Sequence, residues 1–245
     1  MPGRTDEADS PGSHRVDLLI PERRIVFEVN AGALEHHPAP DSPTGFRRYK
    51  DIQNRGDRAA MLVIPNSCLI TAAKRYIVDP GVAMQGAPYT SAIEGLGVDP
   101  FSVQDVILTH LHFDHVGALV EFPGRRVLVH RKELAAPYAE IQKGLLELCD
   151  VEVLDGDDGE VEPGLRWMLT PGHADGLITL LVDTEDGLVA IPSDCVGPLP
   201  EYFDSMMLPD DFPERETLLT QWKKIRDLQP KTVIPGHYAP FRLAS

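Results

Sequence analysis

The sequence predicts an α/β domain in which helices cover β-sheets, and three observations support this class. Short apolar runs of strand length recur along the 245-residue chain. Amphipathic segments of helical length separate several of these runs. Hydrophobic residues make up 42% of the chain, enough for a core between layers. We therefore expect one domain over residues 16–245, preceded by a mobile tail over residues 1–15 that is rich in Pro, Gly, Ser and charge.

The expected strands are 16–20, 24–29, 61–65, 67–72, 75–79, 106–109, 126–130, 165–170, 177–184, 187–194 and 232–237. The first two, VDLLI and RIVFEV, are expected to form an antiparallel pair. The polar, Pro-rich segment from Ala31 to Arg58 is too long for an ordinary connection, and we expect a loop there.

Helices are expected at roughly 90–96, 116–122, 132–148 and 213–228. In the last of these, Leu218, Leu219, Trp222 and Ile225 share one face. Pro213 suits its first turn, and Pro230 lies just beyond its end.

Charge and composition exclude several classes of function. The net charge is −15, and no run of Lys and Arg is longer than two, so we expect a small-molecule substrate and no nucleic acid. No apolar run approaches membrane-spanning length, and the N-terminal residues lack the apolar region of a signal peptide. We expect a cytoplasmic protein without a membrane partner, whose three widely spaced cysteines form no disulfide framework.

The stretch THLHFDHVG, residues 109–117, contains three of the nine histidines. It follows the apolar run VILT and precedes a short amphipathic segment, so it lies at a strand-to-helix turn, where ligand-binding residues gather in α/β folds. Side chains two residues apart in an extended segment point the same way, so His110 and His112 can bind one metal ion together. Asp114 and His115 lie past the bend and can face a second ion.

Three further polar residues each follow an apolar run: His173 in TPGHADG, Asp194 in GLVAIPSD and His237 in TVIPGH. Imidazole and carboxylate ligands suit zinc, iron or manganese, and zinc is the usual ion of imidazole-rich sites. An aspartate can also bridge two ions, although a strand-end aspartate is often a cap or turn residue.

The other histidines and Cys195 have structural interpretations. His14, His36 and His37 lie in polar segments and are expected at the surface. His130 ends the run RVLVH, where packing or support of the site is the expected role. Cys195 is next to Asp194, and we expect a small apolar filler rather than a ligand or nucleophile.

Taken in order, HLHFDH (110–115), PGH (171–173), SD (193–194) and PGH (235–237) resemble the motif set of the metallo-β-lactamase-fold hydrolases. The upstream YIVDPG (76–81) resembles the motif in which an aspartate, here Asp79, supports the metal ligands from behind. The similarity spans roughly residues 60–240. It implies an αββα four-layer sandwich with two divalent metal ions, most often Zn²⁺, at the edge where the sheets meet.

The resemblance implies two ligand sets that share one carboxylate: His110, His112 and His173 for the first ion, Asp114, His115 and His237 for the second, and Asp194 as a bridge between them. A hydroxide would form the other bridge and attack an ester, thioester or lactone carbonyl. Asp114 would carry a proton between the nucleophile and the leaving group.

Within this family the chain is most similar in length and ending to the N-acyl homoserine lactonases and related lactonases and esterases. Asp194 argues against a di-zinc β-lactamase, which lacks that residue. A tyrosine of those lactonases, three residues past the bridging aspartate, is replaced here by Gly197, and Tyr202, Tyr238 or Tyr89 are candidate substitutes.

We therefore expect a dinuclear metal-dependent hydrolase of a small carbonyl ester or lactone. A glyoxalase II-like thioesterase and an iron-dependent oxidoreductase are alternatives, and a phosphodiesterase or nuclease is less favoured.

Substrate specificity is expected to come from segments 31–58 and 197–212. The second segment and the residue after His237 supply the substrate-contact candidates Tyr202, Phe203, Met206, Met207, Phe212 and Tyr238. Apolar residues in so long a segment indicate a lid over an acyl chain, an oligomer interface such as that of a homodimer, or packing under the final helix. The sequence leaves these three interpretations open.

Overall fold

The computed structural model describes residues 14–30, 33–39, 42–82, 89–196 and 200–243, and within these ranges the strands form three sheets. The six-stranded sheet has the order β1-β5-β6-β7-β8-β9, with β1 (Arg15–Ile20), β5 (Ser67–Thr71), β6 (Arg75–Val78), β7 (Asp105–Ile107), β8 (Arg126–His130) and β9 (Asp150–Leu154). The five-stranded sheet has the order β10-β11-β12-β13-β14, with β10 (Asp158–Glu162), β11 (Leu165–Leu169), β12 (Ile178–Thr184), β13 (Gly187–Ser193) and β14 (Thr232–Pro235). The three-stranded sheet has the order β3-β2-β4, with β2 (Arg23–Asn30), β3 (Ala33–Ala39) and β4 (Arg58–Ile64).

The α-helices are α1 (Ser42–Asn54), α2 (Tyr89–Gly95), α3 (Phe113–Val116), α4 (Arg131–Leu134), α5 (Ala139–Leu146), α6 (Pro200–Ser205) and α7 (Arg215–Asp227), with 3-10 turns at Pro100–Ser102 and Leu119–Glu121. Within the described ranges, no helix is long and apolar enough to cross a membrane.

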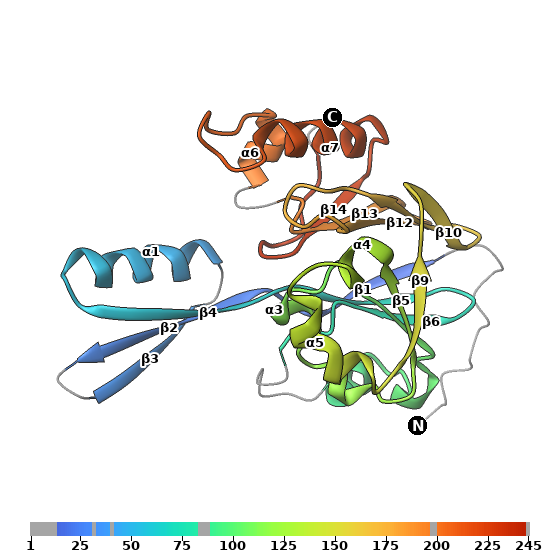
Figure 1. The fold of residues 1–245 in the computed structure, drawn as a ribbon, viewed down its shortest axis with the longest axis horizontal. Helices are drawn as coiled ribbons and strands as arrows, with labels where there is room; N and C mark the ends of the chain where they lie inside the picture. The colour runs from blue at the N-terminus through green and yellow to red at the C-terminus, as the bar shows by residue number, and fades with distance from the viewer. Residues whose placement is uncertain (1–13, 31–32, 40–41, 83–88, 197–199, 244–245) are drawn as a thin grey trace, which may run out of the picture.

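The two larger sheets pack face to face between layers of helices, which is the predicted αββα sandwich (Figure 1). The period-two alternation of strand side chains builds these layers. In β8, Leu128 packs between the sheets, whereas Val127 and Val129 pack under the helices α2 and α5. In β12, Leu180 faces the other sheet, and Leu181 packs under α6 and α7. The core therefore consists of three apolar layers, which explains why so many strands are apolar on both faces.

The predicted antiparallel pair of the first two strands is wrong, because β1 pairs with β5 whereas β2 pairs with β3 and β4. Each strand instead continues past a proline into the next one, β1 through Pro21 into β2 and β4 through Pro65 into β5. Proline has no N–H for a ladder, so the hydrogen-bonded sheets separate at this point. The predicted loop from Ala31 to Arg58 is also wrong, because it contains β3 and α1, which extend from the body as an arm (Figure 1).

The remaining elements follow the sequence with local differences. The run expected as one helix over 132–148 divides into α4 and α5, and the segment 116–122 forms only the end of α3 and a 3-10 turn. In β9, DVEVL, acidic residues interrupt the apolar ones, and in β10, DGEVE, Val161 is the one apolar side chain, so neither strand forms the continuous apolar run that identified the other strands. Of the expected mobile tail, residues 1–13 lie outside the described residues, and β1 begins at Arg15.

Candidate metal centre

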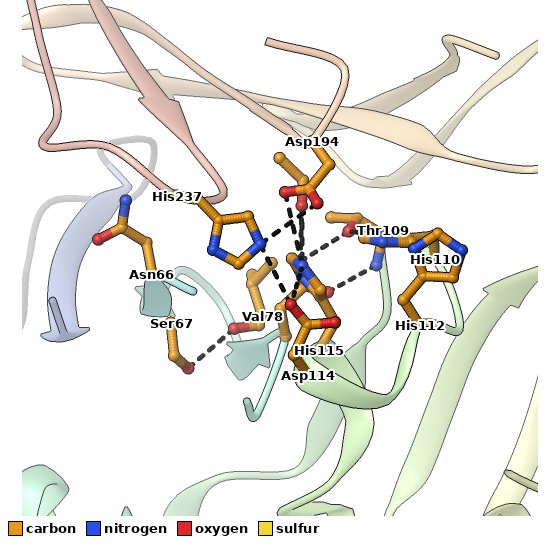
Figure 2. A network of polar contacts seen from close by, with 12 residues as sticks. Asn66, Ser67, Val78, Thr109, His110, His112, Asp114, His115, Asp194 and His237 are labelled. Carbon is orange, nitrogen blue, oxygen red and sulfur yellow. Dashed lines mark hydrogen bonds and ion pairs between the residues drawn. The ribbon is translucent and has the colours of Figure 1, made fainter. Parts of the chain in front are cut away.

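The histidines and aspartates singled out in the sequence lie together at one edge of the sandwich, each just after a strand. Figure 2 shows this cluster and labels all of its members except Asp79 and His173. Asp79 follows β6, the His110–His115 stretch follows β7, His173 follows β11, Asp194 follows β13 and His237 follows β14. Strands β6 and β7 are parallel, as are β13 and β14. The carboxyl ends of parallel strands share one edge of a sheet, so the two sheets deliver their polar residues to the same place.

A first group contains His110, His112 and His173. Nδ1 of His112 and Nε2 of His173 are 2.9 Å apart, and the His110 ring lies 4.6 Å from the His112 ring and 5.1 Å from the His173 ring, centroid to centroid. One nitrogen from each residue lies within 4.8 Å of the others. This arrangement is compatible with a single metal ion held by three imidazoles.

A second group contains Asp114, His115 and His237. Asp114 Oδ2 lies 3.2 Å from His237 Nε2 and 3.8 Å from His115 Nε2. These ligand atoms also lie within 4.8 Å of one another. The side chain of Asp114 is 30% exposed, so this carboxylate lies at the mouth of the cluster rather than beneath it.

The carboxylate of Asp194 lies between the two groups. Its Oδ2 is 3.3 Å from His173 Nε2 and 3.3 Å from His237 Nε2, and its Oδ1 is 3.5 Å from His115 Nε2. One side chain therefore contacts histidines of both groups, which is the placement that a bridging ligand requires.

Asp79 orients the buried histidines from behind. It accepts hydrogen bonds from the backbone N–H of Thr109 at 2.8 Å, from the Thr109 hydroxyl at 2.6 Å and from the Ser193 hydroxyl at 3.0 Å. His115 Nδ1 lies 3.0 Å from the same carboxylate and must donate to it, so in the neutral ring that a metal ion requires the lone pair of His115 is on Nε2, which faces the site. Asp79 also lies close to His110 and His115 in space. Because its oxygens already accept these hydrogen bonds, Asp79 supports the histidines and is not a free metal ligand.

The tautomer of His110 follows from the same network. The Thr109 hydroxyl donates its one proton to Asp79, so at 3.1 Å from His110 Nδ1 it can only accept. His110 therefore carries its proton on Nδ1 and its lone pair on Nε2.

The backbone at the site is also unusual. Asp79 and Ser193 both have φ of +48°, a conformation that is rare for residues other than glycine and that clusters at functional sites.

Buried polar atoms at the site lack hydrogen-bond partners among the described residues. They include Nε2 of His110, Nε2 of His115 and Oδ1 of Asp194. A buried polar atom without a partner costs free energy, and here the unpaired lone pairs point into one small space. Imidazole nitrogens and a carboxylate oxygen are also the ligands that zinc prefers, so the residues present fit divalent metal ions.

The charges of the cluster shift the pKa values of its members strongly in the metal-free chain. Burial lowers the pKa of His237, but Asp194 and Asp114 outweigh burial and raise it to about 9. Burial likewise opposes a raised pKa at His115, where Asp194 and Asp79 prevail. Burial would raise the pKa of Asp194, but His237 and His115 hold it well below its usual range. The buried carboxylates are thus stabilised by nearby positive charge, which protons on His115 and His237 supply when no metal ion is bound.

The histidines of the first group behave differently. Burial lowers the pKa of His110 well below its usual value, with neighbouring histidines acting in the same direction, and burial also lowers the pKa of His173. Both rings are therefore neutral near pH 7, as metal ligands must be.

Asn66, which follows β4, holds the turn that carries His237. Its side-chain N–H groups donate to the backbone oxygens of Pro235 and Tyr238, both at 2.7 Å, and its backbone N–H donates to Gly236 O at 2.7 Å. Gly236 itself lies against Asp194, and a Cβ at this position would overlap Asp194 Oδ1. Asn66 could not be recognised from the sequence, because an asparagine after a proline is typical of an ordinary turn.

The substrate-contact candidates are placed unevenly. Phe203 is fully buried, and its ring centroid lies 5.6 Å from that of Trp222 in α7. This contact agrees with the interpretation that the segment packs under the final helix. Tyr202, Met206 and Phe212 are half-buried against the same cluster, and Met207 is 65% exposed. Tyr238 and Tyr89 are buried, which leaves Tyr202 as the accessible member of the three tyrosines considered as substitutes. Gly197 lies outside the described residues.

Other expectations divide in the same way. Cys195 is fully buried, and burial raises the pKa of its thiol to about 12, in agreement with an inert filler. His130 is buried, and its Nε2 lies 3.0 Å from Gly156 O, a structural contact. The expectation that His14 is at the surface is wrong, because it pairs with Thr184 in an isolated bridge and is buried beside Glu162. The side chains of His36 and His37 lie outside the described ones.

The sequence matches the Metallo-beta-lactamase superfamily over residues 61–237. Among curated proteins, an N-acyl homoserine lactonase of Bacillus cereus is 35% identical over 106 residues, which are 42% of this chain and 42% of the relative. The match thus spans less than half of that relative's length.

Among solved structures, a quorum-quenching N-acyl homoserine lactone lactonase superposes with a TM-score of 0.62 at 21% identity, covering 91% of both chains. An N-acyl homoserine lactone hydrolase with N-hexanoyl-L-homoserine bound at its catalytic metal centre superposes with a TM-score of 0.62 at 20% identity, covering 91% of this chain and 92% of that one. At such identities these likenesses concern the fold. The superfamily match covers most of the chain and contains every residue of the cluster, so the chain belongs to the metallo-beta-lactamase superfamily.

Proposed function

We propose that the protein is a dinuclear metal-dependent hydrolase that acts on a small carbonyl ester or lactone. The observation that carries the proposal is the position of Asp194, whose carboxylate lies 3.3 Å from a histidine of each group. A mononuclear or purely structural site would not require a shared carboxylate between two complete ligand groups.

In this proposal His110, His112 and His173 hold one ion, Asp114, His115 and His237 hold the other, and Asp194 contacts both. Two divalent ions, when bound, lower the pKa of a water molecule and polarise a carbonyl oxygen. The choice of zinc follows from the imidazole-rich ligand set, because five of the six unshared ligands are histidines. Iron and manganese are the alternatives.

Asp114 is the residue proposed to move a proton during the reaction. It combines partial exposure with a pKa held below its usual range, because His237 and His115 outweigh the effect of burial. An ionised carboxylate at the mouth of the site can accept a proton from the nucleophile and donate it to a leaving alkoxide.

The substrate class is supported by the relatives and by charge. The Bacillus cereus relative is a lactonase that acts on an N-acyl homoserine lactone, as its name states. The chain has a net charge of −15, which disfavours polyanionic substrates such as nucleic acids and leaves small, weakly charged esters and lactones. Because Phe203 is buried under α7, acyl-chain contacts in the 197–212 segment are proposed only for its accessible side chains, Tyr202 and Met207.

The test is a substrate panel on zinc-loaded protein, consisting of lactones, carboxylic esters, thioesters, phosphodiesters and a chromogenic cephalosporin. We expect hydrolysis of a lactone or ester and a loss of about a hundredfold or more in the Asp194→Asn variant. Asp210→Asn is the matched control, because Asp210 is fully exposed near the start of α7. Hydrolysis of thioesters alone would mean that the substrate is a thioester and not an ester or lactone. A bound pair of iron ions without any hydrolysis would contradict the proposal.

A further inference from the structure

We infer that Glu133 is a positioning residue that sets the spacing between the two loops that carry His112 and His173. The inference rests on the proposed function, since it concerns the first ligand group. Glu133 lies in α4 and is fully buried, yet it is not among the residues of the cluster.

The carboxylate of Glu133 is hydrogen-bonded to both loops at once. Its Oε2 accepts from the backbone N–H of Leu111 at 2.8 Å, and Leu111 lies between His110 and His112. Its Oε1 accepts from the backbone N–H of Gly176 at 2.9 Å, three residues after His173. One loop follows a strand of the six-stranded sheet and the other joins two strands of the five-stranded sheet. The two oxygens of one side chain therefore connect loops of different sheets.

Tyr138 adds a third connection. Its hydroxyl donates to Glu133 Oε2 at 2.9 Å, and its ring packs against the ring of His112 with centroids 4.8 Å apart. Glu133 thus acts on His112 through the backbone on one side and through a ring contact on the other. A second layer of hydrogen bonds of this kind fixes the orientation of metal ligands.

The approach of Gly176 to Glu133 requires a residue without a side chain. A Cβ at this position would lie 2.5 Å from Glu133 N, 2.9 Å from Cγ and 2.9 Å from Oε1. Since real Cβ atoms do not approach backbone nitrogen so closely, any larger residue would push the His173 loop away from α4. Glu133 thus supplies the acceptor oxygen, and the glycine at position 176 allows the loop to approach it closely enough to donate.

Glutamine cannot replace Glu133 in this role. All the groups that face the carboxylate are donors, namely two backbone N–H groups and a hydroxyl, so both oxygens must accept. Glutamine keeps one acceptor oxygen and places an NH₂ group against a donor. One of the two loops would lose its anchor while the volume of the side chain stays the same.

The experiment compares zinc binding by the full-length wild type and two variants, Glu133→Gln and Glu162→Gln. Glu162 is the matched control, because it also accepts from a backbone N–H, that of Ala73, and from a tyrosine hydroxyl, that of Tyr76. Ala73 lies in the turn before β6, at the end opposite to Asp79. Stepwise zinc dissociation constants are measured by competition with a chromophoric chelator, and bound zinc is counted by elemental analysis.

We expect Glu133→Gln to weaken one of the two zinc-binding steps by about 10–100-fold and to leave the other step unchanged. Glu162→Gln should bind two zinc ions as the wild type does. Double variants identify which of the two zinc-binding steps Glu133→Gln affects. In a His112→Ala background, Glu133→Gln should cause no further loss, whereas in a His237→Ala background it should cause the full loss.

Three outcomes would overturn the inference. If the wild type binds two zinc ions and Glu133→Gln binds both with unchanged affinity, Glu133 has no positioning role while the proposed function stands. A wild type that binds no zinc contradicts the proposed function and the inference together. If Glu133→Gln does not fold, Gly176→Ala is measured instead, because it keeps the carboxylate and displaces only the loop. Failure of both variants to fold with or without zinc would make Glu133 a folding residue and overturn its assigned role.

Discussion

At the scale of single residues, the site depends on groups that no motif identifies. The histidines and Asp194 could be predicted from the sequence because each follows an apolar strand-like run. The tautomers of His110 and His115 could not, because they follow from the geometry around Asp79 and Thr109. Glu133 gave no signal either, since a glutamate at the start of a helix is ordinary, and the N–H groups that donate to it come from two loops that are distant in sequence.

Gly236 offers a test of the Asp194 position. We predict that Gly236→Ala displaces the Asp194 carboxylate, because the added Cβ would overlap Oδ1, and that zinc affinity falls by about a hundredfold. Zinc titration monitored by competition measures this effect. Gly144→Ala in α5 is the control, because a Cβ there meets no atom within 4 Å and should leave zinc binding unchanged. Equal zinc binding by both variants would contradict the placement of Asp194.

Cys195 should be protected in the native protein although it is next to Asp194. Its side chain is fully buried, whereas Cys149 is partly exposed. We predict that iodoacetamide at pH 8 modifies Cys149 well before Cys195, as measured by mass spectrometry of peptides, and that urea exposes all three cysteines equally. Rapid modification of Cys195 in the folded chain would indicate a reactive thiol rather than a filler.

At the scale of elements, prolines and turns explain what the strand pattern could not. The apolar runs predicted most of the strands of the two larger sheets, because these strands are buried on both faces. The pattern carried no information on partners, so it joined β1 to β2 across Pro21. Partners are determined by contacts distant in sequence, as between β1 and β5.

Asn66 connects the base of the arm to the turn that carries His237. It accepts from Glu22 N at 2.8 Å and donates to the carbonyl oxygens of Pro235 and Tyr238. We predict that Asn66→Asp lowers the free energy of unfolding by about 1–3 kcal/mol, since an aspartate has no donor for the two buried carbonyls. Urea unfolding measures the loss. Asn54→Asp at the exposed end of α1 is the control, and an equal loss in both variants would contradict the role of Asn66.

At the scale of the whole molecule, the αββα sandwich brings five strand ends from two sheets to one edge. The resemblance of the motifs predicted this architecture, and residues 61–237 match the superfamily. The arm formed by β2, β3, β4 and α1 was not predicted, because its helix is polar and its segment reads as a loop. The sequence was informative where burial imposes a pattern and uninformative where an element projects from the core.

Metal removal should destabilise the whole domain. The cluster connects turns of both sheets, and its carboxylates and histidines lose the metal ions that they share when zinc is removed. A ligand at about a thousand times its dissociation constant stabilises by about 4 kcal/mol. For a domain of this size we predict a fall in melting temperature of roughly 8–16 °C on chelation, reversed by added zinc. A melting temperature that is independent of chelator would contradict metal ligation by the cluster.

The most direct test of the central claim is a crystal structure of the zinc-loaded protein with anomalous data collected on both sides of the zinc absorption edge. The account predicts two anomalous peaks, one beside His110, His112 and His173 and one beside Asp114, His115 and His237, with the Asp194 carboxylate in contact with both. A single peak, or peaks that leave Asp194 without a metal contact, would contradict the dinuclear centre.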